Sequence, residues 1–453
     1  MKLLSDKHWH FHFWVLVSLC MGLLLAACGD NTPTPATGAT GSTTAAGAAA
    51  GDPNAPITVW VDDTRKGAVA LFQQKYPDQA SKIKIEVVDR AAFPGKVLLF
   101  NNTGKGWPDV VFAEPNIVAQ VADPAHNYPL DLTPYVSADI RSKFAGLSDC
   151  TFDGKLFCLR NDLAQNVLWY NKKLMDQFGY TVPKTWEDYT ALGLKVAKEH
   201  PGYVIGAVGD NQAVNVYFGG SNCPLQRALS GSQVMINTAD PNCTRVATML
   251  DTLIAAKAVS NFGPFDPDFA KLGTDNKILM LPAASWYGEY VFKATYYKAN
   301  ITDSSLGVAE PPKWAADSKT YTAAQGGAAW TVYRNTKNPK LATDLVLFLT
   351  TANDYQATAP TFPAYIPAAD AWHATIQNDK LYAADPYPVL KASAAYLYPE
   401  WSQVRYDVAT SYAKIVNAGL KDGKTVASLM DAFQKDLVPL AGAQGYEVVT
   451  KAT

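Results

Sequence analysis

The chain has 453 residues, a length that fits two lobes or domains better than one compact core. Its 39 Lys and Arg residues nearly balance its 41 Asp and Glu residues, so the formal net charge is −2, and no nucleic-acid partner is indicated. A hydrophobic fraction of 48% argues against global disorder. Only six histidines occur, three of them in the first twelve residues, which disfavours a zinc site or a histidine-based catalytic triad. Composition alone therefore indicates a two-lobed protein with few obvious catalytic groups, and we expect no metal site.

The N-terminus has the pattern of a secretory signal. Lys2 and Lys7 precede an apolar run at 13–27, which is too short to cross about 30 Å of hydrocarbon comfortably. The run ends in Leu-Ala-Ala followed by Cys28, which resembles the lipobox of bacterial lipoproteins. This resemblance implies removal of residues 1–27, lipidation of Cys28 and attachment to the outer face of the cell membrane. An ordinary secretory signal with an incidental cysteine is the alternative.

A tether is expected after the signal. Residues 29–55 consist mainly of Gly, Ala, Thr, Pro and Ser and contain no large apolar residue. Such a composition is typical of a flexible linker. We therefore expect 28–55 to be the lipid-bearing cysteine and its tether, with the folded body beginning near Pro56.

Four later cysteines fall into two close pairs, Cys150 with Cys158 and Cys223 with Cys243. In an oxidising compartment these pairs are the favoured disulfides, although three connectivities are formally possible. A four-thiolate metal site is disfavoured because no C-x-x-C spacing occurs.

The body of the chain alternates predicted strands and helices. Strands are predicted at 57–61, 83–88 and 108–114, with helical patterns at 68–76 and near 97–100 between them. This order implies a parallel sheet buried on both faces, with ligands bound beyond the carboxyl ends of the strands. Asp62, Asp63 and Glu114 stand at those ends, where helix capping is an equally common role.

Further along, a strand is predicted at 166–171, and a helix begins after Thr185. Thr185 has the position of an N-cap, with Asp188 three residues later. Trp186 falls on the apolar face of this helix, so we expect it to pack in the core.

Several segments, in order, resemble one family. They are PDVVFAEPN (108–116), LDLTPYV (130–136), DGKLFCLRND (153–162), VLWYNKKLMDQFGYTVPKTWEDY (167–189), KILMLPAASWYGEY (277–290), the Gly-Gly segment with its following helix (323–351) and the closing helical pair (399–437). The chain is similar to bacterial extracellular solute-binding proteins of ABC importers, family 1, the maltose- and oligosaccharide-binding type. The resemblance covers almost all of the chain after the tether.

The resemblance implies a periplasmic-binding-protein-like α/β fold of type II, with two lobes around a ligand cleft. Lobe 1 would combine 56–162 with 326–355, and lobe 2 would combine 163–325 with 356–453. Crossovers are expected near 160–166, near 324–328 and after Thr351. Ligand-driven hinge closure of a monomer would then be recognised by the membrane subunits of the importer.

A carbohydrate ligand needs aromatic rings for its C–H face and polar groups for its hydroxyls. Trp286 and Trp401, the latter expected near the exposed mouth of its helix, match the family's stacking positions, and Tyr287 is their companion. The full set of expected ligand contacts is Trp286, Trp401, Tyr287, Asp62, Asp63, Glu114, Asp162, Gln165, Gly326 and Gly327, with Asn211, Gln212 and Tyr217 as weaker candidates.

Other functions remain open at this point. A secreted glycoside-active enzyme would also be rich in aromatics, but no carboxylate pair stands out. The family resemblance implies a non-catalytic role, so we expect no enzymatic activity and no cofactor. A receptor for a metal, with tyrosines such as Tyr296 and Tyr297 as ligands, or for a peptide or polyamine, is the alternative within the binding class.

Overall fold

The computed structural model describes residues 51–88, 96, 99–100, 102–123, 126–297 and 304–451, all within one compact unit, Ala46–Thr453. The signal, Cys28 and the tether up to residue 50 lie outside the described residues. So do residues 97 and 98 of the helical stretch expected near 97–100, whereas residues 99 and 100 are helical. Within the described part of the chain, no helix has both the length and the apolar character needed to span a membrane.

The folded body begins earlier than the sequence predicted. The backbone amide of Asp52 donates to the carbonyl of Lys337 (2.8 Å), and the side chain of Asn338 donates to the carbonyl of Ala55 (3.0 Å). Ala55 is only 6% exposed. Residues 51–55 are therefore part of the body, because a small residue such as Ala55 can be packed although its segment has the composition of a linker.

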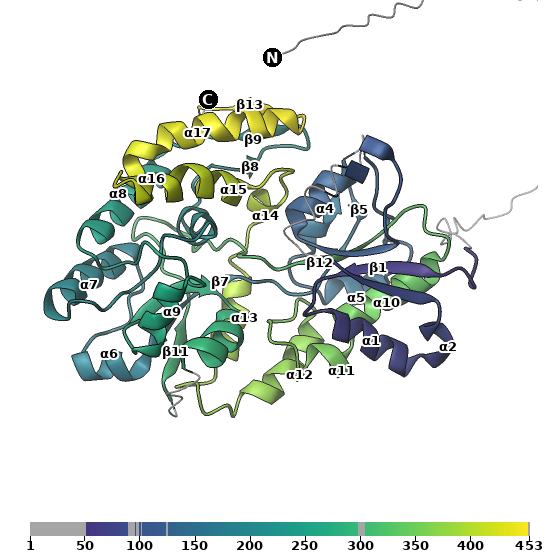
Figure 1. The fold of residues 1–453 in the computed structure, drawn as a ribbon, viewed down its shortest axis with the longest axis horizontal. Helices are drawn as coiled ribbons and strands as arrows, with labels where there is room; N and C mark the ends of the chain where they lie inside the picture. The colour runs from purple at the N-terminus through teal and green to yellow at the C-terminus, as the bar shows by residue number, and fades with distance from the viewer. Residues whose placement is uncertain are drawn as a thin grey trace, which may run out of the picture. The chain divides into compact units, whose positions relative to one another are not determined.

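The first sheet has five strands in the order β2 (Ile83–Val87), β1 (Ile57–Val61), β3 (Val110–Ala113), β12 (Ala329–Val332) and β6 (Leu159–Arg160). The three N-terminal strands are parallel, as predicted, but β12 runs antiparallel to both β3 and β6. The sheet is mixed because β12 returns from a distant part of the chain. Helices α1 (Lys66–Lys75), α4 (Pro115–Ala122) and α10 (Pro339–Thr351) pack around it (Figure 1).

Two further sheets form the other half of the unit. In one, β7 (Asn166–Asn171) lies between β10 (Met280–Ala284) and β11 (Leu306–Ala309), antiparallel to both. The other joins β13 (Glu447–Val449), β9 (Gln233–Met235) and β8 (Arg227–Ala228). Figure 1 shows the surrounding helices α6 (Lys172–Phe178), α7 (Trp186–Glu199), α8 (Pro241–Ala255), α9 (Pro267–Thr274) and α17 (Val426–Ala443).

The start of α7 confirms a local prediction. The hydroxyl of Thr185 accepts a hydrogen bond from the backbone amide of Asp188 (3.0 Å), and Trp186 is 1% exposed. The cap satisfies a backbone donor that has no partner inside the helix, while Trp186 supplies the apolar anchor.

The remaining elements are shorter or lie at the margins of these layers. They are α2 (Pro77–Ala80), α5 (Ala138–Ser142), β4 (Thr151–Phe152), β5 (Lys155–Leu156), α11 (Asn353–Gln356), α12 (Ile366–Ile376), α13 (Tyr387–Ala394), α14 (Pro399–Ser402), α15 (Val408–Tyr412), α16 (Ala418–Lys421), the 3-10 helices η2 (Leu147–Cys150) and η4 (Gly219–Ser221), and the π-helical segments η3 (Val214–Phe218), η5 (Gly288–Tyr296) and η6 (Ala413–Asn417).

Three chain segments run side by side between the sheets. Gln165 pairs with Ala324, and Asp162 pairs with Pro363, each in an antiparallel bridge. The amide of Asn161 also donates to the carbonyl of Ala328 (2.9 Å). The sequence predicted crossovers in these segments. Their backbone pairing joins the two halves of the unit.

Both cysteine pairs form disulfides, with Cα–Cα distances of 5.0 Å for Cys150–Cys158 and 4.8 Å for Cys223–Cys243. The first closes the loop that contains β4 and β5, and the second ties the segment after η4 to the start of α8.

Candidate functional site

A cleft with two adjoining chambers separates the five-stranded sheet from the other sheets. The first chamber has a volume of about 660 Å³ and is lined by Asp62, Asp63, Thr64, Arg65, Val87, Val88, Asp162, Phe265, Trp286, Tyr290, Gly326, Gly327, Ala328 and Thr361. The second has about 510 Å³ and is lined by Glu114, Pro115, Asn116, Ile117, Asp210, Asn211, Gln212, Asn215, Gln226, Phe265, Trp286, Ala324, Gln325, Gly326, Trp401, Ser402, Tyr406, Asp407 and Val408. Because Phe265, Trp286 and Gly326 line both, the two chambers form one continuous site.

An aromatic surface lies where the chambers meet. Trp286 follows β10, and its indole N–H donates to the carbonyl of Gln325 (2.9 Å), which fixes the ring orientation. Phe265 is 65% exposed, and its ring lies nearly parallel to that of Trp286, with an interplanar angle of 15° and centroids 6.1 Å apart. Tyr290 meets Trp286 edge-on. Exposed apolar faces of this kind are suited to stacking against a flat, partly apolar ligand.

The turn after β1 supplies the polar wall of the first chamber. Asp62 accepts hydrogen bonds from the hydroxyl of Thr64 (2.7 Å) and from the amide of Arg65 (3.0 Å), so its carboxylate also organises its own turn. Asp63 is exposed and pairs with Lys66. Both predicted residues line the chamber. The alternative role of helix capping is not seen for them, because the N-cap of α1 is Arg65, whose side chain makes no capping hydrogen bond.

Arg65 is a lining residue that the sequence did not single out. Its guanidinium contacts Asp62 (3.1 Å) and lies 4.7 Å from the centroid of the Phe112 ring. Burial would lower the pKa of Arg65, but the carboxylates of Asp162 and Asp62 outweigh burial and raise it. The side chain is therefore a fixed cation at the wall of the cleft.

Two glycines form the backbone floor. Gly326 and Gly327 have φ angles of +85° and +75°, in the left-handed region that disfavours other residues. A Cβ atom on Gly327 would lie 2.8 Å from the guanidinium of Arg160 and 2.8 Å from the carbonyl of Leu163. Gly327 is therefore crowded by other parts of the protein, and the position requires a residue without a Cβ atom.

The second chamber gathers polar groups from separate loops. Glu114 is the residue before α4, and Asp407 is the N-cap of α15, where it accepts from the amide of Ala409 (3.0 Å). Asp210 accepts from the amide of Gln212 (2.6 Å), and its burial raises its pKa. Glu114, Asn211 and Gln212 were expected here, whereas Asp210, Gln226, Asp407 and Phe265 were missed because each comes from a loop without a periodic pattern.

Two expected ligand contacts are core residues instead. Tyr287 is 0% exposed, its hydroxyl accepts from the side chain of Gln325 (3.0 Å), and burial raises its pKa. Gln165 is also 0% exposed, with its amide bonded to Ser285 (3.1 Å) and to the carbonyl of Leu390 (2.7 Å). Neither residue lines a chamber. The expectation is corrected because both side chains use their polar atoms to join protein segments. The weaker candidate Tyr217 is likewise buried.

Trp401 lines the second chamber but does not stand at an exposed mouth. It is 3% exposed, its indole N–H donates to Asn215 (2.8 Å), and its ring packs on Gly219. The long helix expected to follow it is interrupted, because α14 ends at Ser402 and α15 starts only at Val408. Trp401 is thus mainly a core residue whose edge reaches the cleft.

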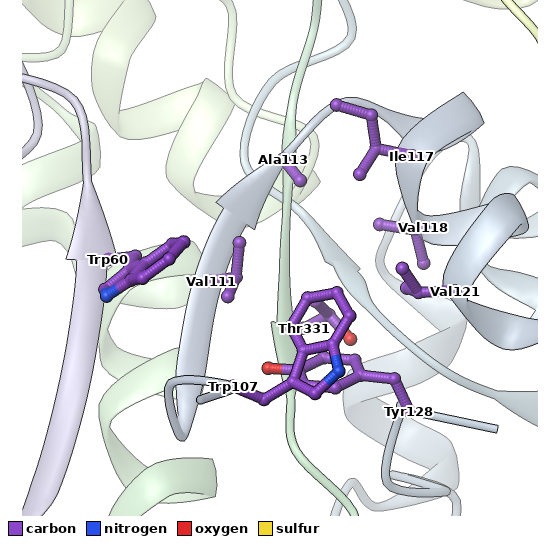
Figure 2. A pocket seen from close by; sticks show the side chains of 9 residues that line it. All are labelled: Trp60, Trp107, Val111, Ala113, Ile117, Val118, Val121, Tyr128 and Thr331. Carbon is purple, nitrogen blue, oxygen red and sulfur yellow. The ribbon is translucent and has the colours of Figure 1, made fainter. Parts of the chain in front are cut away.

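A separate cavity lies beneath α4 in the first half of the unit (Figure 2). It is lined by Trp60, Trp107, Val111, Ala113, Ile117, Val118, Val121, Tyr128 and Thr331 and holds only about 10 Å³. That space suits at most one water molecule. The described residues contain no group of three or more His, Cys, Asp or Glu side chains placed to hold a metal ion.

Comparisons with known proteins agree with this geometry. The arabinooligosaccharide-binding protein of Halalkalibacterium halodurans is 24% identical over 144 residues, a match covering 30% of this chain and 31% of the relative. The "Probable ABC transporter-binding protein" of Deinococcus radiodurans is 23% identical over 84% of this chain and 79% of its own length. The solved binding protein of B. animalis subsp. lactis Bl-04, in complex with beta-1,6-galactobiose, superposes with a TM-score of 0.70 at 20% identity. That alignment covers 87% of this chain and 99% of the solved chain.

These likenesses confirm the periplasmic-binding-protein-like fold expected from the sequence. The family described as bacterial extracellular solute-binding protein matches residues 67–387, which is more than half of the chain. The chain therefore belongs to the bacterial extracellular solute-binding protein family.

Proposed function

We propose that this protein captures a carbohydrate, a sugar or oligosaccharide, in its cleft and delivers it to the membrane subunits of an ABC importer. The observation that carries the proposal is the aromatic surface of Trp286 and Phe265 at the junction of the two chambers, with carboxylates on the surrounding walls. The binding of arabinooligosaccharide and galactobiose by relatives supports the same ligand class.

The chemistry follows from the surface of a sugar ring. Its C–H face would stack on Trp286, and its hydroxyls would donate to carboxylates and accept from Arg65. Each charge-assisted hydrogen bond is worth about 1.5–3 kcal/mol when it is shielded from water. The proposed lobes, 56–162 with 326–355 and 163–325 with 356–453, would close around the ligand about the three crossovers.

The proposal includes the compartment and the partners. Lipidation at Cys28 and the tether would hold a monomer on the outer face of the membrane, close to the importer subunits. Because its family is one of solute-binding proteins, the protein would bind its ligand without transforming it.

A ligand screen tests this function. We expect the midpoint of thermal unfolding to rise with one or more mono- or oligosaccharides, because a ligand that binds only the folded state stabilises it. Titration calorimetry would then give the affinity, and the same sugars would be recovered unchanged after incubation. A screen without any stabilising sugar, or turnover of a chromogenic glycoside, would refute the proposal.

A further inference from the structure

The cleft concentrates negative charge. Among the described residues that line the two chambers there are six carboxylates and a single guanidinium, that of Arg65. The whole chain, in contrast, has a formal net charge of only −2. A concave surface with one dominant sign focuses the field on whatever enters it, so the cleft discriminates between ligands by charge.

Unlike those of the first chamber, the charged residues described in the lining of the second chamber are all negative. Its described lining includes Glu114, Asp210 and Asp407 and no Lys or Arg. The carboxylates of Asp210 and Asp407 accept hydrogen bonds from neutral donors, the amides of Gln212 and Ala409. Such donors hold the carboxylates in place but leave their charges uncompensated.

An unpaired acceptor lies in the same wall. Gln226 is 6% exposed, and its amide N–H donates to the carbonyl of Trp401 (2.6 Å). Its Oε1 atom is buried and has no hydrogen-bond partner among the described residues. A buried acceptor without a partner costs roughly 1–3 kcal/mol. Because the atom is buried, a ligand donor would satisfy it only after the side chain turned toward the chamber.

The volumes indicate how a ligand would divide between the chambers. Each alone lies in the range of about 300–1,000 Å³ that is typical of small-molecule sites, and Trp286 borders both. A ligand that stacks on Trp286 therefore has room to extend into the second chamber with its next ring.

We infer that the second chamber selects a sugar ring carrying a protonated amine and that the cleft rejects sugars carrying carboxylates. This inference rests on the proposed carbohydrate function and names the substrate class within it. An ammonium group donates three hydrogen bonds and bears the charge that Glu114, Asp210 and Asp407 attract, whereas a uronate would be repelled by the same groups.

The test compares four trisaccharides by titration calorimetry: those of glucosamine, glucose, galactose and galacturonate, at pH 6 in low salt. We expect the glucosamine trisaccharide to bind roughly tenfold more tightly than the neutral ones, with no measurable binding of the galacturonate. The preference for the amine should shrink as salt rises, because screening weakens the attraction between charges.

A charge variant and a matched control locate the effect. E114Q/D210N removes two cleft charges while keeping the acceptor oxygens, and it should abolish most of the preference for the amine. D139N/D431N makes the same change of net charge at two exposed positions, 72% and 80% exposed, and should retain the preference. The single variants E114Q and D210N, checked by thermal unfolding, separate a folding defect from a binding effect.

Equal or tighter binding of a neutral or acidic trisaccharide would overturn the inference, and so would an unchanged amine preference in folded E114Q and D210N. Failure of all four probes would also overturn it. The carbohydrate function itself falls only if the wider screen of sugars finds no ligand.

Discussion

Replacing Gly327 by alanine should destabilise the protein far more than the same change at Gly326. Both residues have positive φ angles, +75° and +85°, so each substitution carries the left-handed penalty of about 1–2 kcal/mol. At Gly326 that is the whole cost, since the added Cβ meets nothing closer than Trp286 Nε1 at 3.9 Å.

At Gly327 the new methyl group collides with fixed neighbours. Its Cβ would lie 2.8 Å from Arg160 Nη2, 2.8 Å from the carbonyl oxygen of Leu163 and 2.9 Å from Ala164 Cβ. Arg160 cannot move easily, because it is fully buried and pairs with Asp149 at 2.8 Å. Overpacking of this kind adds about 1–3 kcal/mol, so we expect a total loss of about 2–5 kcal/mol.

The assay is urea unfolding of the wild type and both variants, followed by circular dichroism and by the fluorescence of tryptophan. Sugar affinity is measured in parallel, since Gly326 lines both chambers and G326A is expected to weaken binding while leaving most of the stability. Equal free energies of unfolding for G326A and G327A would show that the close approach at Gly327 does not constrain the crossover.

Four further substitutions address separate parts of the molecule. W286A should weaken sugar binding by at least about tenfold with little loss of stability. W401A, which replaces a residue that is 3% exposed, should instead lower the free energy of unfolding by about 3–5 kcal/mol. Calorimetry measures the first effect and urea unfolding the second, and the reverse pattern would contradict the proposed site. D123N removes the charge that pairs with Arg405 (2.6 Å) across the cleft, between the end of α4 and the loop before α15. If this pair favours the closed form, sugar affinity should fall several-fold and the radius of gyration from X-ray scattering should rise; unchanged values would exclude that role. Burial raises the pKa of Asp149 to about 6 despite the opposing effect of Arg160, above the unfolded value near 3.9. Its contribution to the free energy of unfolding is therefore complete below about pH 4 and is lost as the pH rises through 6, a change of about 3 kcal/mol. Urea unfolding of the wild type and D149N across this pH range should reveal the change as a growing or shrinking difference between the two proteins. Parallel pH profiles of the two proteins would argue against it.

Local features of the fold could be predicted from the sequence because they depend on neighbouring residues. The strand at Ile57–Val61 and the Thr185 cap follow from apolar runs and from a side chain that reaches its own backbone. The antiparallel course of β12 could not be predicted, because it depends on how a segment more than 200 residues later re-enters the sheet.

The candidate site was only partly predictable for the same reason. Asp62, Asp63 and Glu114 follow strands, and the geometry of a sheet places strand ends at a cleft. Arg65 and Phe265 reach the cleft through a helix start and an irregular loop, for which no periodic pattern exists. Tyr287 was misplaced because adjacent residues after a strand point in different directions, so Trp286 faces the ligand space and its neighbour faces the core.

Gln325 connects the buried residues beside the cleft to residues that line it. Its carbonyl accepts from Trp286 (2.9 Å), its Oε1 accepts from the amide of Ala284 (2.9 Å), and its Nε2 donates to Tyr287 (3.0 Å). Three hydrogen bonds thus attach residues 284–287, which include Trp286, to the segment that continues into Gly326. That segment also pairs with the predicted crossover at Gln165. In the proposed function, a ligand stacked on Trp286 would therefore act on the backbone about which the two halves would rotate. Ligand stacking and closure would then be coupled through neighbouring backbone, as is needed if occupancy alone is to set the conformation.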